Sequence, residues 1–188
     1  ANLVATTGGE NASAGYQTAL RLMMFFILPA WGMSNAAATL VGQNLGAKQL
    51  DRAEASVMKT MKYNVIFMAF VTVLFLVLGE WFVSFFTPDP AVRKEAVLAV
   101  RIISSGYIFY GVGMVMLNAF NGSGDTRTPT WINFFGFWLL QIPLAYLLAQ
   151  NLKLGEQGVF IAIPVSEAAI TIASYIIFKK GRWKLIRV

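Results

Sequence analysis

Glu167 is the residue whose type and position in this sequence most directly suggest chemistry. It lies about midway along residues 158–178, which contain no other Asp, Glu, Lys or Arg. In a segment that crosses a bilayer, a charged residue near the centre costs about 2.5–3.5 kcal/mol, and protonation of a carboxylate lowers that cost. Thr171 lies one turn later on the same helical face. Two interpretations stay open: a site for a proton, a cation or a cationic substrate, and a protonated acid that is hydrogen-bonded to a neighbouring helix.

Residues 102–121 carry a second set of polar and soft side chains. Tyr107, Tyr110, Met114 and Asn118 recur every three or four residues, which places them on one face of a helix. Tyr and Met side chains suit a pocket for flat lipophilic cations, through cation–π contact and adaptable packing. Ordinary helix packing is the alternative. Asn118 argues against it, because an amide without a hydrogen-bond partner is costly in lipid.

The first long uncharged stretch of the chain combines small and polar side chains. Ala38, Gly42 and Gly46 are four residues apart, so they form a small helical face that another helix can approach closely. Asn35 and Gln43 lie on a neighbouring stripe. Their side chains need partners from protein or water rather than from lipid. We therefore include Asn35 and Gln43 among the candidate residues of an ion or substrate pathway.

Composition predicts the elements that position these residues. Of the 188 residues, 57% are hydrophobic and only 13% are charged, and the mean hydropathy is +0.61. The chain has no Cys and no His, which excludes disulfides, thiol nucleophiles, Ser–His triads and the commonest metal ligands, so we expect neither a metal site nor a cofactor. The predicted fold is all-α, a polytopic transmembrane helix bundle of about five spans. The expected spans are residues 14–45, 63–86, 102–121, 129–150 and 158–178.

The connectors between these spans differ in charge and predict the orientation. Those on one side carry ten Lys and Arg residues, and those on the other side carry five. The positive-inside rule then places the more basic side, with the C-terminus, in the cytoplasm. The expected location is the plasma (inner) membrane. The net charge of +6 gathers at helix ends, which favours membrane lipids over nucleic acid as partners. We expect residues 8–11 to form a loop and residues 46–62 a charged connector with an amphipathic surface helix.

Three motifs point to a known family. The first is Pro29-Ala30-x-Gly32-x-x-Asn35-Ala36-Ala37-x-Thr39-Leu40-Val41-Gly42-Gln43-Asn44-Leu45-Gly46-Ala47. The second is Phe86-Thr87-Pro88-Asp89-Pro90-x-Val92. The third is Phe120-Asn121-Gly122-Ser123-Gly124-Asp125-Thr126-Arg127-x-Pro129. Together and in this order they resemble the multidrug and toxic compound extrusion (MATE) family of transporters.

The resemblance implies the C-terminal half of a twelve-helix transporter, with the tail of helix seven followed by helices eight to twelve. It implies no enzyme but an antiporter, in which proton or sodium enters while drugs, often organic cations, leave by alternating access. The N-terminal lobe of the same protein would be a partner, and this chain a fragment. The family's carboxylates lie in helices one and seven and, in some branches, in helix ten. Residues 102–121 correspond to helix ten and contain no acid, which departs from the sodium site of those branches.

Other functions remain as alternatives. A lipid-linked oligosaccharide flippase of the same superfamily would need a strongly basic cavity for pyrophosphate, and the expected spans contain none. A membrane-embedded enzyme such as a lipid transferase would need clustered acids or His near a membrane face. A structural membrane subunit without transport activity would not need the polar stripes.

Overall fold

The structure is a computed structural model that describes residues 2–185. These residues form helices and no strand, which confirms the all-α prediction. Along the chain the elements are α1 (Asn2–Gly46), α2 (Leu50–Ser84), α3 (Pro90–Ser104), α4 (Tyr107–Gly122), α5 (Arg127–Asn133), the π-helical η1 (Phe134–Gln141), α6 (Ile142–Tyr146), the π-helical η2 (Leu147–Asn151), α7 (Gly155–Lys179) and the 3₁₀ turn η3 (Arg182–Leu185).

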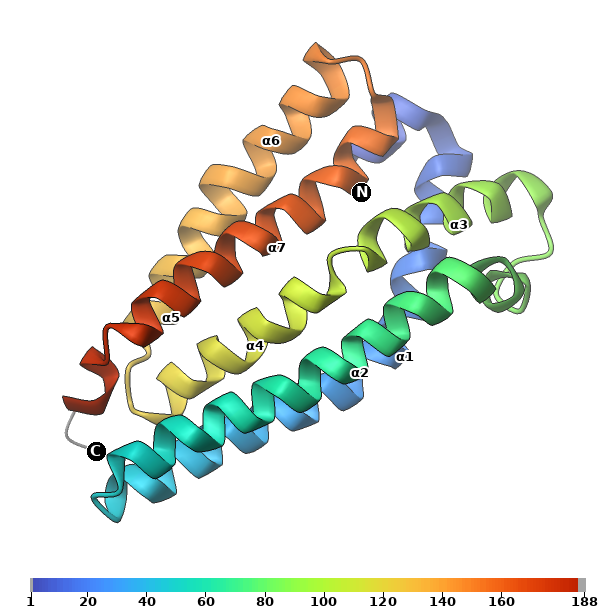
Figure 1. Cartoon of the computed structure of the whole chain (residues 1–188). Coiled ribbons are helices and arrows are strands. Elements are labelled where there is room, and N and C mark those ends of the chain that lie inside the picture. The colour runs from blue at the N-terminus through green and yellow to red at the C-terminus, as the bar shows by residue number, and fades with distance from the viewer. Residues whose placement is uncertain (1, 186–188) are drawn as a thin grey trace.

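The helices form five crossings of a bundle (Figure 1). α1, α2, α7 and the continuous helix from α5 to η2 are each long and apolar enough to span a membrane. α3 and α4, which meet at a bend of 53°, are long and apolar enough for a fifth crossing when taken together. Successive crossings run in opposite directions, so the turns after α1 and α4 lie at the same end of the bundle as the end of α7 (Figure 1). The structure therefore agrees with a polytopic bundle of about five spans.

Three boundaries differ from those expected. Residues 8–11 are not a loop, because α1 is only kinked there, at Gly9 with φ 77°. The segment 46–62 is not a separate surface helix, because α2 is continuous from Leu50 to Ser84. At 35 residues, α2 is about 52 Å long against a hydrocarbon thickness of about 30 Å, so its charged first turns can extend into water. The expected span 102–121 is broken at residues 105–106, and its first three residues belong to α3.

Gly106 lets the break between α3 and α4 pack directly against α7. A Cβ atom at this position would lie 2.8 Å from Cα of Pro164, so only glycine fits without a shift of the backbone. The break frees carbonyl groups of α3 from the helix. The hydroxyl of Thr72 on α2 donates a hydrogen bond of 2.9 Å to one of them, the carbonyl of Ser104. The bend is thus held by neighbours on two other helices.

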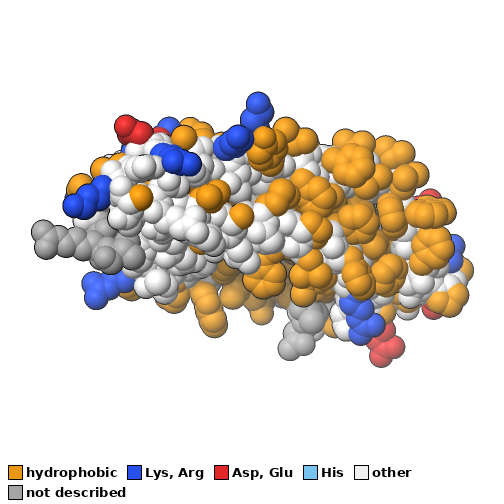
Figure 2. All heavy atoms as spheres, turned by 90° about the horizontal axis from the view of Figure 1, so that it is seen from below, with side chains coloured by type: hydrophobic (Ala, Val, Ile, Leu, Met, Phe, Trp, Pro, Cys, Tyr) orange, Lys and Arg blue, Asp and Glu red, His pale blue; other side chains and the backbone are white. Residues whose placement is uncertain are grey.

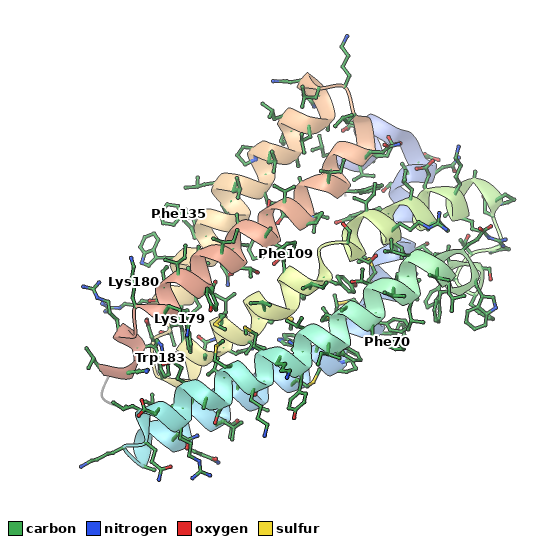
Figure 3. The ribbon with its side chains drawn as sticks, viewed as in Figure 1. Phe70, Phe109, Phe135, Lys179, Lys180 and Trp183 are labelled. Carbon is green, nitrogen blue, oxygen red and sulfur yellow. The ribbon has the colours of Figure 1, made fainter. Side chains whose placement is uncertain are left out.

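Two hydrophobic clusters fill the bundle. One includes Phe75 and Tyr107, whose rings meet edge to face with centroids 6.0 Å apart. The other lies toward the end of α7, where Phe178 stacks on Trp183 with centroids 4.8 Å apart. Many large apolar side chains are nevertheless exposed, among them Phe70 of α2, which is 60% exposed (Figure 3). They form a broad hydrophobic patch over the right-hand part of the face in Figure 2. Such a surface is compatible with contact to lipid rather than water.

α1 and α4 approach each other closely at Ala38 and Gly42, but not at Gly46, which the sequence had placed on the same small face. A Cβ atom at Gly122 would lie 2.6 Å from Cα of Ala38, and one at Gly42 would lie 3.2 Å from the carbonyl oxygen of Gly122. Ala38 and Gly42 thus belong to a close helix contact. Gly46 does not: a Cβ there would meet no atom within 4 Å, because Gly46 ends α1 beyond the contact with α4.

An ion-pair cluster connects α2 to the end of α7. Lys179 and Lys184 both bind the carboxylate of Glu54, Lys179 at 3.0 Å. The indole Nε1 of Trp183 donates to the carbonyl of Phe178 at 3.0 Å, which fixes the turn η3 below α7. Figure 3 shows Lys179 and Trp183 together at this end of the molecule. The two lysines lower the pKa of Glu54 by hydrogen bonding and charge, Lys184 more strongly than Lys179.

Candidate ion and substrate site

Glu167 lies in the middle of α7 and points into the bundle. It is 8% exposed, and no hydrogen bond to its carboxyl is present among residues 2–185. Pro164, one turn earlier, packs against Gly106 at the break between α3 and α4. A buried carboxyl without a protein hydrogen-bond partner must be solvated by water, neutralised by a proton or paired with a cation. The position therefore requires a small, exchangeable partner.

Two cavities of about 230 and 250 Å³ meet at Glu167. Tyr110 of α4 and Glu167 of α7 are the two residues that line both of them. The structure thereby brings together two of the predicted site residues that are 57 positions apart in the chain. Because the carboxyl and the phenol line both cavities, each group can interact with a ligand or a proton in either cavity.

The first cavity contains a polar group without a partner. Its lining includes Tyr16, Tyr107 and Gln141 beside Glu167 and Tyr110. The phenol of Tyr107 donates a long hydrogen bond of 3.5 Å to the carbonyl of Met23. The amide oxygen Oε1 of Gln141 is buried and has no hydrogen-bond partner. Since an unpaired buried acceptor is costly, this oxygen attracts a donor or a cation to the cavity.

The second cavity is lined by amides and aromatic rings. Asn118 lies in its wall and donates a hydrogen bond of 2.8 Å from Nδ2 to the hydroxyl of Ser34 on α1. Asn121 and Asn133 also line this cavity, as does the indole of Trp31. The prediction that Asn118 avoids lipid is therefore supported by a specific protein partner. Its amide oxygen has no hydrogen-bond partner among residues 2–185, which leaves an acceptor next to the cavity.

Three of the predicted site residues lie outside both cavities. Thr171 is buried, and its hydroxyl donates a hydrogen bond of 2.6 Å to the carbonyl of Phe109, so it links α7 to α4. Asn35 and Gln43 are exposed on α1 and line neither cavity. The four-residue spacing placed them correctly on one stripe, but the rotation of α1 in the bundle directs that stripe outward. Among the described residues they are surface groups rather than part of the interior site.

Sequence reasoning missed the buried polar residues of α2. Asn64 is fully buried and donates a hydrogen bond of 3.0 Å to the carbonyl of Gly111 on α4. Thr72 likewise reaches the carbonyl of Ser104. Both stand in an otherwise apolar segment, which is the signal that could have identified them. They connect α2 to α4 and α3 but do not line the cavities that meet at Glu167.

The linings of the two cavities indicate which charge they can accommodate. Neither cavity has a Lys or Arg in its lining, and both contain the Glu167 carboxyl. The other lining residues include aliphatic side chains together with aromatic rings, Met sulfurs and amides, and the last three can bind cations through π faces and lone pairs. An anionic ligand would find neutral donors from amides and tyrosine hydroxyls but no basic group, and the Glu167 carboxylate would repel it. The arrangement therefore favours a proton, a small inorganic cation or a lipophilic organic cation.

The fold and the cavities define a polytopic α-helical membrane protein with a polar interior that contains an acid. The family model of MatE matches residues 1–147, and the chain accordingly belongs to the MatE family. A probable multidrug resistance protein NorM of Thermotoga maritima is 26% identical over 184 residues, which are 98% of this chain and 39% of that protein. A protein named FAD transporter, from Shewanella oneidensis, is 24% identical over 166 residues, which are 88% of this chain and 36% of that protein.

A solved structure supports the same fold. It is described as the outward-facing conformation of a multidrug resistance MATE family transporter of the MOP superfamily. It superimposes with a TM-score of 0.90 at 21% identity and covers 98% of this chain and 41% of that chain. The match to the MatE family model confirms the resemblance to the MATE family. This chain spans about 40% of the length of the relatives that it matches.

Proposed function

We propose that this chain is the C-terminal lobe of a multidrug exporter that moves lipophilic, often cationic compounds out of the cell in exchange for protons or sodium ions. The observation that carries the proposal is the burial of Glu167 in the wall shared by two cavities that have no basic lining residue. The name of the Thermotoga maritima relative, a probable multidrug resistance protein, supports the same activity.

Coupling follows if Glu167 holds either the driving ion or the exported cation. A carboxylate in a cavity stabilises one positive charge, and a proton or sodium ion on it removes the attraction for a second one. Entry of the driving ion would then release an organic cation, and the reverse exchange would reload the site. Tyr110 would contact the aromatic part of the compound, and Asn118 would offer its amide oxygen from the second cavity.

The exposed polar residues of α1 and the charge pattern of the chain support a partner lobe and an orientation in the membrane. Asn35 and Gln43 project from a helix that is apolar enough to span the membrane, so a protein partner covers them best. The N-terminal lobe of the same protein would be that partner, and the two lobes would alternate access to the cavities. The end of the bundle with α7's last turn would face the cytoplasm, in the plasma (inner) membrane.

Anionic substrates are the second candidate class, because one relative is named FAD transporter. A flavin dinucleotide or a lipid-linked pyrophosphate would require basic groups at the substrate site. Both cavities of this lobe lack them, so the lining favours cations. A structural subunit without transport activity is the third candidate. It would not need the buried, unpaired oxygen Oε1 of Gln141 in the same cavity as Glu167, so this feature favours transport.

The test is Glu167→Gln in the complete transporter, with export measured as uptake of a fluorescent organic cation into inverted membrane vesicles. We expect export to fall at least about tenfold at unchanged protein level, because Gln keeps the shape but cannot hold a charge. Glu156→Gln is the matched control, since Glu156 lies on the same helix and lines neither cavity. Wild-type export by Glu167→Gln would remove Glu167 from the pathway and with it the proposed coupling.

A further inference from the structure

A third hollow, of about 540 Å³, lies away from Glu167 at the opposite end of the bundle from η3. It is formed by the end of α2, the outer side of α3 and the first turn of α7. Arg93, Lys94 and Arg101 of α3 contribute its positive charge, and Glu80 of α2 is its one acidic lining residue. None of these four side chains forms an ion pair within residues 2–185. With three basic groups and one acid in its lining, the groove therefore carries a net positive charge.

Arg101 lies further toward the membrane interior than Arg93, where water alone solvates its charge less well. α3 is the outer half of a bent crossing and is long and apolar enough to span a membrane only together with α4. Arg101 follows Arg93 by two turns and lies about 12 Å further along the helix axis, toward the membrane interior. Its side chain is exposed rather than buried in the bundle. An arginine in that position extends toward the headgroup region and gains most from a phosphate there.

Apolar groups lie beside the basic residues of the groove. Val97 and Leu98 lie between the basic residues in its lining. Val77, one turn before Glu80 on the same face of α2, is 69% exposed. The surface thus offers cations for a phosphate next to an apolar track for an acyl chain. A free phosphate would use only the first of these two features.

We propose that this groove binds the headgroup of an anionic phospholipid, with the phosphodiester held by Arg93, Lys94 and Arg101 and one acyl chain against Val77 and Val97. This lipid site is separate from the transport site at Glu167 and does not depend on it. Arg93 is already oriented, because its guanidinium donates a hydrogen bond of 3.3 Å to the carbonyl of Thr87. The side chains of Lys94 and Arg101 make no hydrogen bond within the described chain and are free to bind the lipid.

The experiment measures lipid binding to the complete transporter by native mass spectrometry in detergent, without any transport assay. Phosphatidylglycerol is compared with phosphatidylcholine of the same acyl chains. We expect phosphatidylglycerol to bind more tightly, and the double variant Lys94→Gln/Arg101→Gln to weaken its binding about tenfold. Glu80→Gln removes the acid of the groove and should strengthen binding, which keeps the test decisive if the double variant folds poorly. Lys59→Gln/Lys62→Gln removes two charges from the other half of α2 and should change little.

Three outcomes would overturn the lipid site. Equal binding of the two lipids would mean that charge is not recognised. An equal loss in the Lys59 and Lys62 control would mean that lipid follows total charge rather than this groove. Displacement of phosphatidylglycerol by inorganic phosphate at millimolar concentration would identify a free-anion site instead. Because each arm measures binding alone, its failure leaves the efflux result for Glu167→Gln unaffected.

Discussion

The amide Nδ2 of Asn118 donates a hydrogen bond of 2.8 Å to the hydroxyl of Ser34, which joins α4 to α1 at the wall of the second cavity. The same hydroxyl donates to the carbonyl of Trp31 at 2.9 Å. Ser34 is fully buried, so neither group has an easy alternative in lipid. The bond thus fixes the direction of the Asn118 oxygen, which is the acceptor left for a ligand.

Replacing Ser34 by alanine tests this connection. We expect Ser34→Ala to lower the melting temperature of the purified protein, corresponding to about 1 kcal/mol, because the Asn118 amide loses its partner. Ser84→Ala is the control, since the Ser84 hydroxyl is exposed and bonds only to the carbonyl of Trp81 in its own turn. An unchanged melting temperature in Ser34→Ala would mean that water in the cavity replaces the hydroxyl.

The helix contact at Gly122 makes a matched pair of glycine substitutions informative. Gly122→Ala places a methyl group 2.6 Å from Cα of Ala38, so the helices must separate. We expect a loss of folded, monodisperse protein on fluorescence-detected size exclusion, corresponding to about 1–3 kcal/mol. Gly46→Ala adds the same methyl group where nothing lies within 4 Å and should be tolerated. Equal yields of the two variants would contradict the packing of α1 on α4.

Orientation can be tested with single cysteines, because the chain has no native cysteine. Arg52 lies in the first turn of α2, and Leu152 lies in the turn before α7; both are exposed. The start of α2 and the turn before α7 lie at opposite ends of the bundle (Figure 1). We expect Arg52→Cys to react with a membrane-impermeant maleimide only from the cytoplasmic side, and Leu152→Cys only from outside. Labelling of both from one side would contradict five crossings.

The ion-pair cluster at Glu54 predicts a pH dependence with a definite sign. Its two lysines lower the pKa of Glu54 in the folded protein below the free value of about 4.3. The contribution to stability is therefore present above pH of about 4.3 and disappears as pH falls through the lowered value. We expect Glu54→Gln to lower the melting temperature at pH 7, by the equivalent of at most about 1 kcal/mol for a partly exposed cluster.

The same substitution should have no effect once Glu54 of the wild type is itself protonated. Melting curves at pH 7 and at a pH well below the lowered pKa of Glu54 therefore provide the internal comparison. High salt at pH 7 should also reduce the difference, because exposed charges are screened. A constant difference at all pH values would mean that the introduced glutamine packs poorly and that charge is not the cause.

Much of the architecture followed from local properties of the sequence. Uncharged runs of bilayer length identified the crossings, because hydropathy is a property of each segment alone. The same reasoning singled out Glu167 and Asn118, since a carboxyl or an amide in such a run needs a partner in any packing. The order of the three motifs was enough to suggest the MATE family. None of these inferences required knowledge of which helix packs against which.

The tertiary structure decided what local patterns leave open, which is the rotation and register of each helix in the bundle. Spacing showed that Asn35 and Gln43 share a stripe, but only the packing of α1 showed that the stripe faces outward. Spacing also gave Gly42 and Gly46 equal weight, whereas Gly122, far along the chain, selects Gly42 and Ala38. The meeting of Tyr110 and Glu167 between two cavities likewise depends on how α4 crosses α7. Helical periodicity fixes which side chains share a face, and the combined packing of all five crossings fixes where that face points.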